Sequence, residues 1–338
     1  MFGAYRFFLA SLVVLTHSGM HFGSFRPGPM AVICFYIISG YVISALLDNR
    51  AARITPGGFY LERSFRIYPQ FAAHLLISVV FLLATGHVSK LTEIRPDFVS
   101  VLTNASLFPL QFRAFSDDLS AMLYVPTSWS LSLEASFYVA APFLLRSRFQ
   151  DVFGWLSLAV FAAAVLNLLP GPPHTLSYAT IFGTLHFFLL GTWIQRGETR
   201  KVGAWCALMI GTAIAVTLFA SWRPAHIEEA IFGGLSGAAA IYLLKNARNA
   251  RLKHLDDWLG RISYPVFLNH FLFIWSFELL GRDTLSNSDR CLVLAGSWIF
   301  GLICYWAVEH PTHAFRRSLR MMGQRAALAR EGGGPARG

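Results

Sequence analysis

Two ionisable side chains lie in the first long apolar run of the chain, and their spacing places them on one face of a helix. Arg6 and His17 are eleven residues apart, and at about 100° per residue this is roughly 20° more than three full turns. Along the axis they are about 16 Å apart. Ionisable residues at membrane depth are costly, so both are functional candidates. A snorkelling anchor for Arg6 and a water-bonded interfacial histidine for His17 are the structural alternatives.

A later apolar run supplies a carboxylate. Ser130, Glu134 and Tyr138 are spaced four residues apart, which predicts a polar stripe along one helix. Glu134 is expected at a depth similar to that of His17, and a buried carboxylate needs a partner. We therefore predict a contact between Glu134 and His17, which would fix the imidazole tautomer and raise its basicity for general-base catalysis. The alternative is a protonated Glu134 bonded within its own helix.

Two arginines precede the third apolar run. Arg63 and Arg66 are three residues apart, so they lie on adjacent faces of one helical turn, predicted at the cytoplasmic entrance of the span. Arginine binds phosphate in bidentate fashion, which makes the pair a candidate phosphate site. The alternative is a cluster that only fixes membrane orientation. Glu309, at the end of the last apolar run, is expected to pair with a nearby arginine.

The composition indicates which kind of protein positions these residues. Of the 338 residues, 55% are hydrophobic and only 14% are charged, against about 25% charged in soluble domains. The net charge of +10 sits in short clusters between apolar runs, without a basic stripe interleaved with exposed aromatics. This excludes nucleic acid as the expected partner and favours membrane lipid. No metal-binding pattern occurs, so no metal is expected.

The apolar runs predict an all-α fold, a polytopic membrane helical bundle of about ten transmembrane helices. The runs cover residues 3–20, 29–47, 68–86, 129–145, 152–169, 178–195, 203–220, 226–244, 262–280 and 291–309. Twenty lysines and arginines fall on one side of this topology and seven on the other, which predicts cytoplasmic termini. The short run 98–111 is expected to be re-entrant or interfacial. Residues 1–317 form the predicted transmembrane domain, and residues 318–338 a disordered cytoplasmic tail.

At these residues the sequence resembles the acyltransferase-3 family of bacterial membrane O-acyltransferases. Six elements match in chain order and cover nearly the whole sequence. They are the Arg–ten–His element Arg6 to His17, the pair Ser39-Gly40, the Arg-x-x-Arg element Arg63 to Arg66, the Trp-Ser-Leu…Glu…Phe-Tyr signature Trp129 to Tyr138, Asn269-His270 and Glu309-His-Pro311. One departure is Pro29-Met-Ala-Val, where the family has an aromatic-rich Gly-Val stretch.

The resemblance implies an acyl-CoA donor, most often acetyl-CoA, and no bound cofactor. The implied acceptor is a sugar hydroxyl of a cell-surface or exported glycan, or of its lipid-linked precursor, at the bacterial cytoplasmic (inner) membrane. His17 would be the general base supported by Glu134, with an acyl-His17 intermediate as a variant. The other candidates would bind donor or acceptor: Arg63 and Arg66 at the nucleotide phosphates, Arg6 near the donor's path, and Ser39, Trp129, Ser130, Tyr138 and His270.

Two other classes of function compete with this interpretation. A transporter of a small molecule or polysaccharide precursor would also explain ten spans with intramembrane charges, although the chain has no internal repeat of the kind many transporters carry. It predicts substrate flux without dependence on acyl-CoA. A structural subunit of a polysaccharide export machine predicts that substitutions at His17 and Glu134 are silent. A monomer and a homo-oligomer are both compatible with the sequence.

Overall fold

The computed structural model describes residues 2–49, 54–89, 91–170, 173–219, 226–247 and 250–312. Within these ranges the chain is helical, and the only extended pairing is an isolated bridge between Phe22 and Phe25. The predicted all-α fold is therefore confirmed for the described part of the chain. The predicted tail 318–338 lies outside the described residues.

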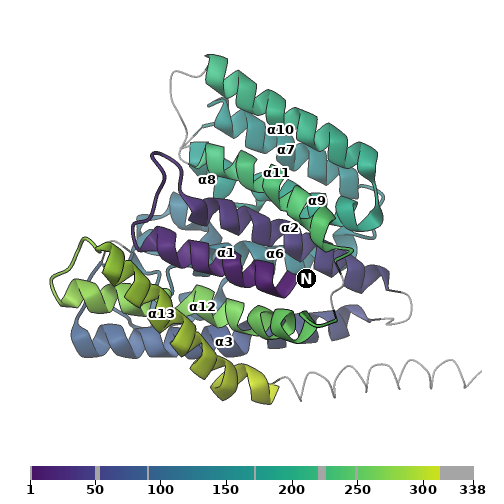
Figure 1. Ribbon diagram of the computed structural model, residues 1–338. Helices are drawn as coiled ribbons and strands as arrows, with labels where there is room; N and C mark the ends of the chain where they lie inside the picture. The colour runs from purple at the N-terminus through teal and green to yellow at the C-terminus, as the bar shows by residue number, and fades with distance from the viewer. Residues whose placement is uncertain are drawn as a thin grey trace, which may run out of the picture.

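Each of the ten predicted apolar runs overlaps one long helix, and these helices lie side by side in a bundle (Figure 1). They are α1 Phe2–His17, α2 Pro27–Asp48, α3 Pro56–Thr85, α6 Ser128–Leu144, α7 Gln150–Val165, α9 Ile181–Arg196, α10 Thr199–Phe219, α11 Ile227–Leu244, α12 Lys253–Leu279 and α13 Asn287–Cys304. A π-helical turn, η2 Tyr305–Glu309, continues α13. The shorter elements are α4 Phe98–Ser106, the 3₁₀ helix η1 Phe108–Phe115, α5 Asp117–Ala121 and α8 Pro173–Tyr178.

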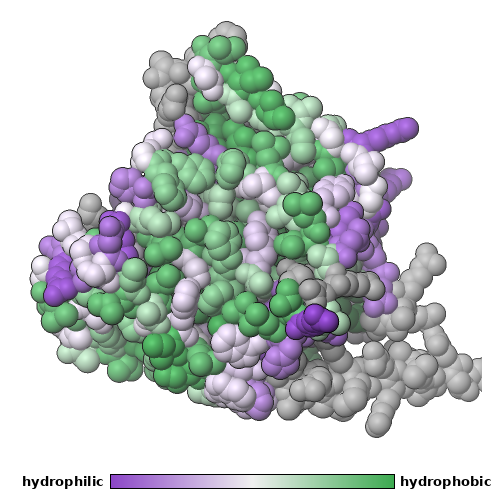
Figure 2. Space-filling view, viewed as in Figure 1, coloured by the Kyte–Doolittle hydropathy of each residue, from purple (hydrophilic) through white to green (hydrophobic). Residues whose placement is uncertain are grey.

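The surface of the bundle is that of a membrane protein. Hydrophobic residues cover the middle of the helices in view, and hydrophilic residues gather mainly toward the helix ends (Figure 2). Among the described residues, five helices are long and apolar enough to cross a membrane: α2, α3, α10, α11 and the continuous segment Asn287–Thr312. Helices α1 and α7 are apolar but shorter, since 16 residues rise only about 24 Å. The count of ten spanning helices stays a prediction.

Helix α3 begins earlier than the apolar pattern predicts. Thr55 caps it by accepting a hydrogen bond from the Gly58 amide at 3.1 Å, Pro56 occupies its first turn, and Gly86 ends it in the left-handed conformation. The first residue of α3 precedes the predicted apolar run 68–86 by about three turns, and these turns carry both polar and apolar side chains. Arg63 and Arg66 therefore lie inside α3, and their position at the cytoplasmic entrance of the membrane span stays a prediction.

Close backbone approach fixes α1 and α2 in the bundle. A methyl group added to Gly3 of α1 would lie 1.8 Å from the Asp256 carbonyl oxygen of α12. On α2, a methyl group at Gly40 would lie 1.8 Å from the Phe188 carbonyl oxygen of α9. Because no larger side chain fits at these two points, the glycines allow the helices to pack closely. Helix α1 lies between α2 and α12, and this packing fixes the positions of its polar residues.

The short run predicted as re-entrant or interfacial folds into α4 and η1. Asp97 and Ser100 form a capping box that starts α4, and Leu107, with a φ of 63°, separates α4 from η1. Helix η1 packs on α6, where Gln111 donates to the Ser136 hydroxyl at 2.8 Å. This contact places η1 beside the middle of α6.

Candidate active site

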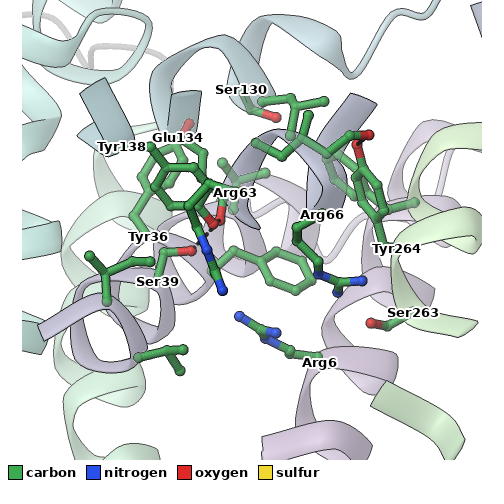
Figure 3. Close-up of a pocket in the computed structure, with 17 residues that line it drawn as sticks. Arg6, Tyr36, Ser39, Arg63, Arg66, Ser130, Glu134, Tyr138, Ser263 and Tyr264 are labelled. Atoms are coloured by element: carbon green, nitrogen blue, oxygen red, sulfur yellow. Dashed lines mark hydrogen bonds between the residues drawn. The ribbon is translucent and has the colours of Figure 1, made fainter. Parts of the chain in front are cut away.

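Three arginines point toward one another into a cavity between α1, α2, α3, α6 and α12 (Figure 3). Arg6 comes from α1, and Arg63 and Arg66 come from successive turns of α3. The cavity has a volume of about 100 Å³, and we call it the arginine cavity. Of the other candidates, Ser39, Ser130, Glu134 and Tyr138 also line it.

Two of the three arginines are paired with carboxylates. Arg63 donates to Glu62 at 2.7 Å, and Arg66 donates to Glu309 at 2.5 Å. The expected pairing of Glu309 with an arginine is confirmed, and it joins α3 to η2. Arg6 has no ion pair with the described residues, and its buried Nε has no hydrogen-bond partner there. Arg6 is thus the cation of this cavity that is most available to an anionic ligand.

The carboxylate of Glu134 belongs to the arginine cavity. Its Oε1 accepts hydrogen bonds from the Tyr138 hydroxyl at 2.5 Å and from the Ser39 hydroxyl of α2. Glu134 is the seventh residue of α6, so it lies about 9 Å along the helix from its first residue. The polar stripe of α6 therefore lines the same cavity as the three arginines.

His17 has a different partner from the one predicted. Its Nδ1 lies 2.8 Å from Nε2 of His270 on α12, and the two rings are nearly parallel, with their centroids 5.1 Å apart. The predicted contact between His17 and Glu134 is therefore wrong. Glu134 lies about two turns inside α6, as its place in the sequence predicts, but its carboxylate is bonded to Ser39 of α2 and Tyr138 of its own helix.

A second cavity of about 380 Å³ is lined by the exposed side of His17, and we call it the histidine cavity. In the hydrogen bond to His270, one of the two nitrogens must carry the proton. If Nδ1 of His17 donates, its Nε2 keeps a lone pair. That Nε2 has no hydrogen bond with the described residues, so it can accept a proton from a ligand hydroxyl or attack an electrophile.

The two cavities adjoin. Val32, Ser130 and Phe267 line both of them. Arg6 of α1 lines the arginine cavity and His17 of α1 lines the histidine cavity. The polar face of this helix therefore runs along both cavities. The arrangement places an arginine cluster and an imidazole in adjoining cavities, about 16 Å apart by helical rise between Arg6 and His17.

Several residues of the histidine cavity were missed by the sequence reasoning. Trp129 was a candidate and lines this cavity, but Arg113, His174, Tyr178 and His226 were not. They come from η1, α8 and the turn before α11. Only the folded chain brings these short segments together, and their spacing carries no motif that could have shown it.

The fold and the two cavities define a helical membrane protein with a buried polar site. The chain belongs to the acyltransferase-3 family, whose sequence profile, described as an acyltransferase domain, matches residues 4–309. It is therefore an acyltransferase. No solved structure gives a significant match.

Three relatives illustrate the range of the family. The exopolysaccharide production protein ExoZ of Rhizobium meliloti is 25% identical over 320 residues, 91% of this chain and 96% of ExoZ. The acyltransferase MdmB of Streptomyces mycarofaciens is 25% identical over 351 residues, 89% of this chain and 84% of MdmB. An uncharacterised Aquifex aeolicus protein is 29% identical over 209 residues, 58% of this chain and 90% of that protein.

Proposed function

We propose that the enzyme transfers an acyl group, in the first instance acetyl, from acyl-CoA to a sugar hydroxyl of an exported or cell-surface glycan or its lipid-linked precursor. The observation that carries this proposal is the pair of adjoining cavities along α1, one with Arg6 and the other with His17. ExoZ, named for exopolysaccharide production, supports a glycan acceptor.

The arginine cavity would receive the donor. Its volume of about 100 Å³ is below the roughly 300 Å³ of the smallest sites for drug-sized ligands. The nucleotide would therefore lie at the mouth, and only the slender acyl-bearing arm would enter. Each guanidinium has five N–H donors, so Arg63 and Arg66 can hold phosphate while they stay paired with Glu62 and Glu309.

The histidine cavity would hold the acceptor. Nε2 of His17 removes the proton of the acceptor hydroxyl while the hydroxyl oxygen attacks the thioester carbonyl carbon. The carbon–sulfur bond then breaks, and the departing CoA thiolate takes up the proton that His17 carries. His270 fixes the ring and its tautomer in this proposal. In the variant route Nε2 itself attacks the thioester carbonyl carbon and the carbon–sulfur bond breaks, which leaves acyl-His17 and the CoA thiolate. The acceptor hydroxyl then attacks the acyl carbon, the carbon–nitrogen bond breaks, and the thiolate takes up the hydroxyl proton.

The proposed membrane placement is multi-pass in the bacterial cytoplasmic membrane with both termini in the cytoplasm. The excess of lysine and arginine on one side supports it. The start of α1 and the end of α13 also point toward the same side of the bundle (Figure 1). The donor then enters from the cytoplasm, and the histidine cavity faces the opposite side.

Reconstitution tests the proposal directly. The full-length protein in liposomes is given labelled acetyl-CoA and glycolipids extracted from a strain that lacks the gene. We expect label in the glycolipid fraction with wild-type protein and with His21→Ala, an exposed histidine outside both cavities, but not with His17→Ala. Label held by the protein without acceptor would identify the acyl-His17 route. Glycolipid flux without acyl-CoA, or full activity of His17→Ala, would contradict the proposal.

A further inference from the structure

The histidine cavity is lined by basic side chains and, among the described residues, by no carboxylate. Its basic lining comes from α1, the segment before α2, η1, α8 and the turn before α11, and consists of His17, Arg26, Arg113, His174 and His226. Arg26 and Arg113 are the two permanently charged side chains of this wall, so an anionic ligand of the cavity would meet positive charge there.

Arg113 is held in a fixed position on the cavity wall. Its guanidinium carbon lies 4.8 Å from the ring centroid of Trp129, and Tyr178 packs against the same indole with ring centroids 5.2 Å apart. The η1 backbone is fixed to α6, because Ser132 donates to the Phe108 carbonyl at 3.0 Å. The side chain is therefore pre-organised by its aromatic neighbour and by the anchored helix that carries it.

No counter-ion for Arg113 occurs among the described residues. Its Nε is buried without a hydrogen-bond partner, and its guanidinium forms no ion pair there. Glu229 is already used: it accepts from the Arg26 amide at 2.8 Å and lies 4.0 Å from His226. A cation in a partly buried site is costly without an anion, and the indole face compensates this only in part.

We propose that the acceptor carries an anionic group, a sugar carboxylate or a phosphate of its lipid linkage, that pairs with Arg113 and so presents the acceptor hydroxyl to His17. Both anions match the planar, bidentate guanidinium. The proposal rests on the proposed function, because it names the class of acceptor for that reaction. Trp129 acts as a positioning residue that holds Arg113 for the incoming anion.

The first test identifies the acylated sugar in the native host. Glycans and lipid-linked precursors from the wild-type strain and from a strain lacking the gene are compared by mass spectrometry. We expect an acyl group that is lost with the gene, on a saccharide that bears a carboxylate or a phosphate. No acyl difference would remove the proposed function itself. An acyl group on a saccharide with neither anion would overturn the acidic acceptor and leave the proposed function intact.

The second test asks whether Arg113 recognises the charge. The acceptor from the first test is assayed as isolated, after chemical reduction of its carboxylates to alcohols, and after enzymatic release of its lipid phosphate. Wild-type protein should lose at least about tenfold in kcat/KM with one of the two treatments, as expected for loss of a partly buried ion pair. The treatment that causes the loss identifies carboxylate or phosphate.

The Arg113→Gln variant sharpens this result. It should have a raised KM for the intact acceptor, an unchanged KM for acetyl-CoA, and no further loss on the treated acceptor. Arg113→Lys, which keeps the charge, should retain part of the discrimination. Arg95→Gln, an exposed arginine outside both cavities, serves as the matched control and should behave as wild type. Equal discrimination in wild type and Arg113→Gln, or none in wild type, would overturn the role of Arg113.

Discussion

The arginine cavity and the histidine cavity differ in how their charges are balanced. In the arginine cavity, the two arginines of α3 are paired with Glu62 and Glu309, and the Glu134 carboxylate is bonded to two hydroxyls. In the histidine cavity, no carboxylate lies on the described wall, and His17 presents an unpartnered nitrogen.

In the proposed reaction, this difference would let one bundle bind two ligands. Ion pairs and hydrogen bonds hold the arginine cavity in one geometry, which would suit the phosphates and thioester of the proposed donor. The histidine cavity is larger, and a ligand would have to balance the charge of Arg113, which would suit the acidic acceptor that we propose. Helix α1 joins the two because Arg6 and His17 share its polar face.

The largest expected effect comes from removing the imidazole. His17→Ala should lower kcat by about 10²–10⁴-fold, the usual contribution of a positioned general base, while binding of acyl-CoA is unchanged. Acyl transfer and equilibrium binding of labelled acetyl-CoA measure the two effects separately. Weaker donor binding in this variant would mean that the cavities do not divide the two ligands as proposed.

The shared wall of the cavities gives the second prediction. Ser130 is buried and lines both cavities, and within the described part of the chain its hydroxyl donates only to the carbonyl of Thr127, the N-cap of α6, at 2.8 Å. Ser130→Trp should fill the junction and lower kcat by about 10²-fold, because a displaced thioester no longer meets the acceptor hydroxyl. Single-turnover transfer, with donor binding measured alongside, checks this.

The matched variant Ser130→Ala removes the hydroxyl without filling the junction and should stay close to wild type. Equal losses for Ser130→Trp and Ser130→Ala would point to the hydroxyl instead of the passage. Full activity of a folded Ser130→Trp protein would show that the acyl group takes another path.

The third prediction compares Arg6, which has no ion pair with the described residues, with Arg66, which is paired with Glu309. Arg6→Gln should raise the KM for acyl-CoA by about 10- to 100-fold, the scale of one charge-assisted phosphate contact, with little change in the unfolding midpoint. Glu309→Gln keeps an acceptor oxygen beside Arg66 but removes the charge that balances this buried guanidinium, and should cost about 3–5 kcal/mol in the free energy of unfolding. For both variants, donor saturation curves measure the KM for acyl-CoA, and thermal unfolding in detergent measures the change in stability. A stability loss for Arg6→Gln as large as that for Glu309→Gln would contradict the distinction.

The sequence carries much of this site because helical periodicity is local. The shared face of Arg6 and His17, and the stripe from Ser130 to Tyr138, follow from 3.6 residues per turn. The residue that a side chain meets on another helix is set by packing, which spacing does not encode. For this reason the pairing of His17 with His270 was missed, although both residues were candidates. Arg113 was missed because η1 lies outside the long apolar runs.

The smallest expected effect tests the corrected position of Glu134. If Glu134 serves the arginine cavity only as a hydrogen-bond acceptor, Glu134→Gln can still accept from Tyr138 and Ser39, and kcat/KM should fall by only about three- to tenfold. If Glu134 instead orients the base, the amide should cost close to 10⁴-fold, as when the carboxylate behind a catalytic histidine is replaced. The matched variant His270→Phe keeps a ring but cannot accept the hydrogen bond, so it should lose more kcat than Glu134→Gln. If Glu134→Gln instead loses more kcat than His270→Phe in steady-state transfer, Glu134 supports His17 after all. The division of their roles between the two cavities would then be wrong.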